Sequence, residues 1–227
     1  MYLAATATPM EMRALERVLD PAVRCQRLVT GVGPMETAHV LTSYLCRAET
    51  LPEGVLVFGI GGAYCLADAS GAAMLDICLA DEEVLADLGI CYGDNMEPFK
   101  AAELGVRNRF PLDKTLTNQA ETALRRQGIT SCRGRFLTVQ CVSGTRKRGE
   151  ALAGFFDGLC ENMEGAAAAR VCAAFSLPCL EVRCVSNLVK DRDRGNWRLK
   201  EACAKAGVAA AHILAYLALQ MPEDKTP

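Results

Sequence analysis

The sequence predicts an α/β fold: one domain of three layers, α/β/α, around a mixed, mostly parallel central sheet. Short apolar runs alternate with helical patterns along the chain, which is typical of a largely parallel sheet covered by helices. The chain has 227 residues, 51% of them apolar, and no Pro-, Gly- or Ser-rich linker and no internal repeat divides it. We therefore expect one domain over residues 1–221 and a polar, flexible tail over 222–227.

The expected strands are short apolar runs, and the expected helices have apolar residues at helical spacing. The strands are predicted at Tyr2–Thr6, Arg27–Val32, Gly54–Phe58, Met74–Ala80, Arg135–Val142 and Cys179–Val185. The helices are predicted at Met10–Leu19, Met35–Arg47, Leu116–Gln127, Arg146–Phe155, Gly165–Phe175 and Trp197–Leu219. In the last helix the most apolar stretch is shorter than the ~20 residues that a membrane helix needs, so we expect it to be buried.

The segment from Asp87 to Asp113 differs from the rest of the chain. It mixes Gly, Asn, Pro and charged residues without a sustained period, and it is longer than an ordinary connection between elements. Such a segment is typical of a functional or lid-like loop.

Composition excludes several classes of function. The net charge is only −2, with acids and bases interspersed, so we expect neither nucleic acid nor a membrane as partner. Residues 1–13 lack the pattern of a secretory signal, which favours a cytoplasmic protein. The 12 cysteines form no C-x-x-C pair and only two histidines accompany them, so we expect small buried hydrophobes and no metal site.

Candidate binding residues follow the predicted strands, because ligands of open α/β sheets lie outside the carboxyl ends of strands. After the first strand, Pro9 presets a helix start and Glu11 falls in the first turn, where the helix dipole alone explains an acid. After the third strand, the Gly59–Tyr64 segment contains Gly59, Ile60 and Gly61. It allows close approach of a ligand to the backbone or a tight turn, and it lacks the dinucleotide-binding pattern.

Two further segments complete the set. Met163 and Glu164 enter an alanine-rich helix, where the acid either complements the helix dipole or lies in a crevice. After the last strand, Ser186 and Asn187 precede a cluster of charges, whose simplest interpretation is a solvated turn with surface ion pairs.

In order and spacing the four segments resemble the nucleoside phosphorylase and nucleosidase superfamily over nearly the whole chain. The matching stretches are Pro9-Met10-Glu11, Gly59–Ala63, Glu161–Ala167 and Arg183–Asn187. Within the superfamily, the futalosine hydrolase family is most similar, on Gly59–Tyr64, Ala86–Gly89, Phe110–Asp113, Phe136–Val139, Glu161–Ala166 and Ser186–Val189 with Arg192, Asp193 and Trp197 following. One departure is Leu75, where this family has glycine before the aspartate, which questions a turn conformation.

The resemblance implies a nucleoside phosphorylase-like fold and hydrolysis of the N-ribosidic bond of futalosine, which releases hypoxanthine in menaquinone biosynthesis. It implies Glu11 as the base for water and Glu164 as the partner of the ribose hydroxyls, with Met163 against the sugar. The remaining substrate-binding residues would be Gly59, Ile60, Gly61, Arg183 and Ser186. It requires no metal or organic cofactor, and it suggests a homodimer or higher homo-oligomer.

Asn187 bears on the choice of purine. Adenine nucleosidases have aspartate at this position, whereas hypoxanthine presents acceptors at N7 and O6 and therefore needs a donor such as an amide. Because asparagine is a poor acid, the leaving base would depend on hydrogen bonds to its anion, or on Asp191 or Asp193. Futalosine also carries a carboxylate on its 5′ arm, for which the candidate partners are Arg107, Arg109, Arg183 and Arg192.

Three other hypotheses remain open. A phosphorylase would use phosphate in place of water, although Glu11 would repel the anion. A methylthioadenosine-type nucleosidase would keep the reaction and change the base. A non-catalytic nucleoside-binding module would keep the fold without the reaction. The presence of both Glu11 and Glu164 argues against this hypothesis. A product that forms only when phosphate is supplied would indicate the phosphorylase. A ligand that is retained without cleavage would indicate the binding module.

Overall fold

The computed structural model describes residues 1–65, 71–93, 95–99 and 104–220, and the predicted α/β architecture is confirmed. The strands are β1 (Leu3–Thr6), β2 (Gln26–Val29), β3 (Val55–Tyr64), β4 (Ile77–Leu85), β5 (Gly89–Tyr92), β6 (Asn95–Pro98), β7 (Arg109–Pro111), β8 (Ser131–Thr138), β9 (Gly158–Asn162) and β10 (Cys179–Val189). The helices are α1 (Pro9–Glu16), α2 (Pro34–Arg47), α4 (Lys114–Arg126), α5 (Arg146–Phe156), α6 (Gly165–Ala174) and α7 (Leu199–Gln220).

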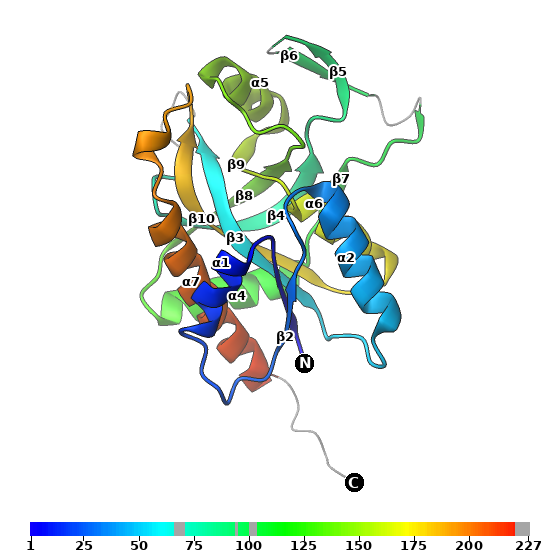
Figure 1. The fold of residues 1–227 in the computed structure, drawn as a ribbon, viewed down its shortest axis with the longest axis vertical. Coiled ribbons are helices and arrows are strands. Elements are labelled where there is room, and N and C mark those ends of the chain that lie inside the picture. Colours follow the sequence, from blue (N-terminus) through cyan, green and yellow to red (C-terminus); the bar gives the residue numbers. More distant parts are fainter. Residues whose placement is uncertain (66–70, 94, 100–103, 221–227) are drawn as a thin grey trace.

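The main sheet is mixed and mostly parallel (Figure 1). Parallel pairs join β1 to β2 and β3, β10 to β3, and β8 to β4 and β9. Antiparallel pairs join β10 to β4, β3 to β9 and β7 to β4. The pairings of β3, β9, β8, β4 and β10 return to β3, so these strands form a distorted barrel from which β1 and β2 extend.

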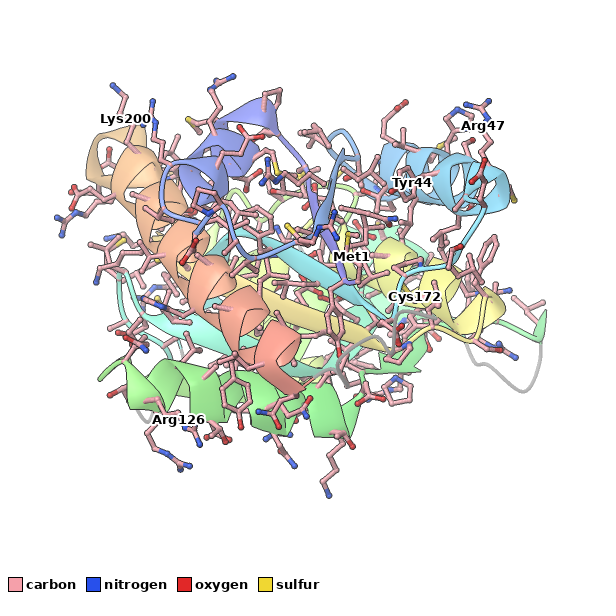
Figure 2. The ribbon with its side chains drawn as sticks, turned by 90° about the horizontal axis from the view of Figure 1, so that it is seen from below. Met1, Tyr44, Arg47, Arg126, Cys172 and Lys200 are labelled. Carbon is pink, nitrogen blue, oxygen red and sulfur yellow. The ribbon has the colours of Figure 1, made fainter. Side chains whose placement is uncertain are left out.

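Helices cover both faces of the sheet. On one face α7 packs against α1, α4, β3 and β10, and on the other α6 packs against α2 and the barrel strands. Figure 2 shows this separation, with Lys200 of α7 and Arg126 of α4 far from Arg47 of α2. By length and composition α7 is the one helix among the described residues that could cross a membrane, but 56% of its most apolar window is buried inside the fold. The prediction of a buried C-terminal helix is therefore confirmed.

Several predicted strand ends are wrong, and two of them involve predicted site residues. β3 continues to Tyr64, so Gly59–Ala63 is extended strand and not a turn. β10 continues to Val189, so Ser186 and Asn187 lie inside the strand, at an irregularity of register between Val185 and Asn187. Glycines and polar residues suggested strand ends locally, whereas pairing between β3 and β10 continues through both segments.

The segment 87–113 was predicted as a loop, and the described part of it is more regular. β5 and β6 pair as an antiparallel hairpin, and β7 adds to the edge of β4. β9 was not predicted at all, although its last residues pair with β3. The predicted tail, 222–227, lies outside the described residues.

The turn before β4 has an unusual backbone at a residue that is not glycine. The strand was predicted from Met74 but begins at Ile77, and Leu75 has a φ of 68°. The Leu75 N–H donates to Val185 O and its side chain packs against the core beneath α7, so tertiary contacts hold a conformation that leucine seldom adopts.

Candidate active site

A cleft of about 230 Å³ opens where the ends of β1, β3, β9 and β10 meet. β9 runs antiparallel to β3, but Gly62 pairs with Glu161 near the last residue of each strand, so both strands deliver residues to the same place. The cleft is lined by Ala7, Thr8, Met10, Glu11, Val32, Ile60, Gly61, Gly62, Val142, Ser143, Glu161, Asn162, Met163, Glu164, Arg183, Ser186, Asn187, Arg192, Trp197 and Leu199. Most of the predicted site residues therefore lie together.

Glu11 is buried, with 3% of its surface exposed, and its two carboxylate oxygens have different environments. Oε2 accepts from Thr6 Oγ1 at 3.0 Å, Thr8 N at 3.0 Å and Thr8 Oγ1 at 2.7 Å. Oε1 accepts only from Ile60 N, at 3.0 Å, among the described residues. An sp² oxygen has two lone pairs, so Oε1 keeps one that can accept a proton in the cleft.

The helix-terminus explanation of Glu11 is also correct. Thr8 is the N-cap of α1, and Thr8 and Glu11 form a capping box in which each side chain accepts from the other residue's backbone N–H. Gly59 lies beneath this carboxylate: a Cβ atom at Gly59 would lie 2.5 Å from Glu11 Oε1 and 2.9 Å from Arg183 Nη1. Gly59 therefore does not line the cleft, but its missing side chain leaves space for the Glu11 carboxylate and the Arg183 guanidinium. Ile60 and Gly61 line the cleft itself.

Glu164 precedes α6 and is 5% exposed. Its Oε1 accepts from Gly33 N at 3.0 Å, and its Oε2 lies 3.2 Å from Arg183 Nη2. Asn162 Oδ1 accepts from the backbone N–H groups of Glu164 and Gly165 at 2.9 and 2.8 Å, which fixes the start of the helix. The crevice predicted for this carboxylate is present.

Arg183 is 2% exposed and forms part of the cleft floor. Its Nε donates to Glu181 Oε1 at 2.8 Å and its Nη1 to Ile60 O at 3.1 Å. The contact between Nη2 and Glu164 is an ion pair without hydrogen-bond geometry. Burial opposes the charge of Arg183, but the carboxylates of Glu181, Glu164 and Glu11 offset it and raise its pKa above the ordinary range.

Asn187 is oriented by its neighbour on β10. Ser186 Oγ donates to Asn187 Oδ1 at 2.9 Å and also lies 3.2 Å from Gly61 O. With the amide oxygen occupied in this way, Nδ2 is the group that Asn187 can offer to a ligand in the cleft. The side chain therefore presents a donor.

Asp191 and Asp193, the predicted alternatives for protonating the base, have structural partners. Asp191 Oδ1 accepts from Arg146 N at the start of α5, and Asp191 lines a separate small cavity beside Asn187. Asp193 accepts from Gly195 N and Asn196 Nδ2. Both aspartates lie outside the lining of the main cleft.

The four candidate arginines differ in their partners and in their position relative to the cleft. Arg109 pairs with Glu82 of β4 and Arg107 is exposed. Arg183 is held in the cleft floor by Glu181 and Glu164. Arg192 lines the cleft, with its guanidinium carbon 4.9 Å from the centre of the Trp197 ring. Within the part of the chain that the structure describes, no carboxylate lies within ion-pair distance of Arg192.

Sequence reasoning did not assign a role to Glu161 or Ser143, which both line the cleft. Ser143 donates through N and Oγ to the two oxygens of Glu161, at 2.9 and 2.6 Å, and Tyr64 OH donates at 3.1 Å. Burial, followed by the charge of Glu161, raises the pKa of Tyr64, so the phenol stays a neutral donor. The family motif contained Glu161, but the partner loop around Ser143 carried no signal.

A second hollow and the cysteines both lack the convergent chemistry of the cleft. A larger hollow, about 710 Å³, lies between β2 and α2, beside Tyr44 and Arg47. Among the residues that the structure describes, no group of three or more His, Cys, Asp and Glu side chains could hold a metal ion, and the cysteines are free thiols.

Comparisons with known proteins agree on the family. A profile described as the phosphorylase superfamily matches residues 24–218. The futalosine hydrolase of Thermus thermophilus is 39% identical over 193 residues, which cover 83% of this chain and 80% of that protein. The futalosine hydrolase of Streptomyces coelicolor is 31% identical, with 98% of this chain and 99% of that protein covered.

Solved structures support the fold. The futalosine hydrolase of Helicobacter pylori superposes with a TM-score of 0.79 at 16% identity, covering 94% of this chain and 97% of that one. A 5′-methylthioadenosine/S-adenosylhomocysteine nucleosidase from Streptococcus pneumoniae, solved with a transition-state inhibitor, gives 0.78 at 21% identity and covers 96% and 100%. The nucleoside phosphorylase-like fold predicted from the sequence is thereby confirmed.

Proposed function

This chain belongs to the phosphorylase superfamily and, within it, to the futalosine hydrolases, and from that premise we propose that it hydrolyses the N-ribosidic bond of futalosine. The products are hypoxanthine and dehypoxanthine futalosine, and the reaction is a step of menaquinone biosynthesis. One observation carries the proposal: Glu11 and Asn187 line the same cleft. Glu11 offers a buried carboxylate oxygen with one free lone pair, and Asn187 offers an amide donor.

Hydrolysis of this bond passes through an oxocarbenium-like ribosyl centre while negative charge builds on the departing base. Glu11 Oε1 takes a proton from the attacking water, and its partners on Oε2 keep the carboxylate oriented. Asn187 Nδ2 donates to the hypoxanthine as charge develops on it. The separate hydrogen bonds of Asp191 and Asp193 favour stabilisation of a hypoxanthine anion by donors over protonation by either aspartate.

The same contacts favour water over phosphate as nucleophile. Glu11, Glu161 and Glu164 line the cleft, and Arg183 is already engaged by Glu181 and Glu164. A phosphate in the place of water would face the Glu11 carboxylate, and the two like charges would repel each other.

We expect Glu164→Ala to lower kcat/KM more for futalosine than for its 2′-deoxy analogue. Gly33 N and Arg183 orient this carboxylate, and the deoxy substrate lacks one of the hydroxyls that it would bind. A hydrogen bond to a charged group is worth about 1.5–3 kcal/mol, so the two losses should differ roughly ten- to hundredfold. Steady-state kinetics on both nucleosides measure the difference, and equal losses would remove Glu164 from contact with the 2′-hydroxyl.

Arg192 is the arginine that we assign to the substrate carboxylate. It lines the cleft, and the Trp197 ring supports it in place of an acidic partner. We expect Arg192→Met to reduce kcat/KM for futalosine about tenfold, through loss of a charge-assisted hydrogen bond, and to leave inosine, which has no carboxylate arm, nearly unchanged.

Arg126→Met is the matched control for this variant. Arg126 also lies over an aromatic ring, 5.0 Å from the centre of Tyr216, but it is on α4, far from the cleft. Equal effects of Arg192→Met on futalosine and inosine would exclude Arg192 as the carboxylate partner.

Incubation with futalosine, aminofutalosine, inosine and methylthioadenosine, followed by chromatography of the released base, tests the proposed substrate. We expect hypoxanthine from futalosine as the fastest reaction. Adenine released faster from methylthioadenosine would instead favour the adenine nucleosidases of the same fold. Cytoplasmic location and a homodimer or higher homo-oligomer stay predictions, which fractionation and sedimentation can check.

A further inference from the structure

Beneath the cleft, Glu83 on β4 and Glu181 on β10 form a pair of fully buried carboxyl groups. An atom at the Cβ position of Gly165 would overlap both Glu83 Oε1 and Glu181 Oε2, so the two oxygens converge on one point above this glycine. Two ionised carboxylates at such a position would repel each other in a medium that screens charge poorly.

Hydrogen bonds around Glu83 determine where a proton can lie. Asn162 Oδ1 accepts from two backbone N–H groups, so its Nδ2 must face Glu83 Oε1, to which it donates at 2.6 Å. Thr138 Oγ1 accepts from Ala166 N at 2.8 Å and donates to Glu83 Oε2 at 2.7 Å. Both oxygens of Glu83 are therefore acceptors toward these neighbours.

Glu181 lacks one donor. Its Oε1 accepts from Arg183 Nε, but its Oε2 has no hydrogen-bond partner among the described residues, although it is completely buried. A buried acceptor without a partner is costly, and a proton on Glu83 Oε1 would satisfy it. A hydroxyl oxygen can donate to Glu181 and still accept from Asn162.

We propose that Glu83 is a positioning residue, held in its neutral form, whose proton bridges Glu83 Oε1 and Glu181 Oε2 and thereby fixes Arg183 and Glu164 beneath the substrate. Ionised Glu181 holds Arg183 through Nε, and Arg183 in turn pairs with Glu164. Glu83 also holds Asn162, which fixes the backbone of Glu164. Two sets of contacts thus connect the neutral Glu83 to Glu164, one through Glu181 and Arg183 and the other through Asn162.

The surrounding charges agree with this assignment. Burial, followed by the charge and hydrogen bond of Glu181, raises the pKa of Glu83 well above its ordinary range. Among the described residues, the titratable groups that interact electrostatically with Glu83, besides Glu181 and Arg183, are the thiols of Cys160 on β9 and Cys179 on β10. Burial raises the pKa of the Cys160 thiol. A hydrogen bond from the Cys179 thiol to Cys172 on α6, followed by burial, raises the pKa of Cys179, so neither thiol adds charge near neutral pH.

Infrared spectra of the intact protein at neutral pH test the proton directly. We expect a band of a protonated carboxyl group in the wild type that shifts in D₂O and is missing from Glu83→Gln. Glu82→Gln is the matched control, because Glu82 is the neighbouring residue and pairs instead with Arg109 and Arg135 on the outside of the sheet. A wild-type spectrum identical to that of Glu83→Gln in this region would overturn the proposal.

The positioning role has two readouts. In NMR spectra, the Nε–H resonance of Arg183 should shift strongly in Glu83→Leu, weakly in Glu83→Gln and not in Glu82→Gln. In kinetics, Glu83→Leu should lower kcat/KM for futalosine by ~10²-fold, because it leaves Glu181 with an unpaired buried oxygen. Glu83→Gln should lose less than about tenfold, because its amide still donates to Glu181 but cannot accept from Asn162.

The pH dependence of unfolding tests whether Glu83 is neutral even if the Glu83→Leu variant does not fold. The raised pKa of Glu83 stabilises the native state fully below the unfolded pKa, and this stabilisation is lost as pH rises through the folded pKa. Stability of the wild type relative to Glu83→Gln should therefore fall with rising pH, and a constant difference would contradict a neutral Glu83.

The kinetic consequence rests on the proposed hydrolysis, whereas the infrared, NMR and unfolding tests do not, so either proposal can fail alone. Equal kinetic losses in the Gln and Leu variants would overturn the positioning role.

Discussion

Glu11→Gln is expected to lower kcat for futalosine by ~10² or more, because a neutral amide cannot take the proton of the attacking water. Three donors surround Oε2, so the amide oxygen of glutamine will take that position. The amide NH₂ group then faces both Ile60 N and the water, where two donors meet without an acceptor. Steady-state kinetics with saturating futalosine measure the loss.

A control separates this chemistry from the capping role of Glu11. Glu16→Gln changes the same residue type on the same helix at an exposed ion pair with Arg27, and it should leave kcat unchanged. Circular dichroism should show both variants folded, because the Thr8 hydroxyl still accepts from the backbone of residue 11. Near wild-type turnover of Glu11→Gln would leave Glu11 with the capping role alone.

Asn187→Asp is expected to reduce kcat/KM for futalosine roughly ten- to hundredfold, because a buried unpaired acceptor and a lost hydrogen bond cost ~1–3 kcal/mol. The amide Nδ2 is the donor that Asn187 offers, and a carboxylate would present an acceptor to the acceptors of hypoxanthine. A protonated aspartate can donate to N7 and accept from a 6-amino group, so relative activity on adenine nucleosides should rise.

The ratio of kcat/KM for futalosine to that for aminofutalosine measures this change of base preference. Asn118→Asp on α4 is the control, since Asn118 binds Arg133 at the surface, and this variant should keep the wild-type ratio. An unchanged ratio in Asn187→Asp would mean that another residue recognises the base.

The alternation of elements and most of the site could be predicted because the information is local. Helical and strand periods gave the layers, and the segments around Glu11, Glu164 and Asn187 matched a family pattern in order and spacing. The cleft brings these three side chains together as the resemblance implied. Their roles in catalysis stay predictions that the variants above test.

Features that depend on distant partners could not be predicted. The strand from Met74 was expected to end at Ala80, before the acidic residues that follow it. β4 nevertheless continues to Leu85, where Glu82 pairs with Arg135 and Glu83 accepts hydrogen bonds from Thr138 and Asn162. Likewise Gly59 looks like a turn residue until Glu11 is known to lie against it.

Hydrolysis by water, without phosphate, is the central claim, and isotope labelling tests it most directly. The enzyme is incubated with futalosine in phosphate-free buffer that contains H₂¹⁸O, and the ribosyl product is analysed by mass spectrometry before exchange of its anomeric oxygen. We expect hypoxanthine and a sugar product with one ¹⁸O at C1′, formed at the same rate when phosphate is added. Product that forms only with phosphate, as a ribosyl phosphate, would contradict the account.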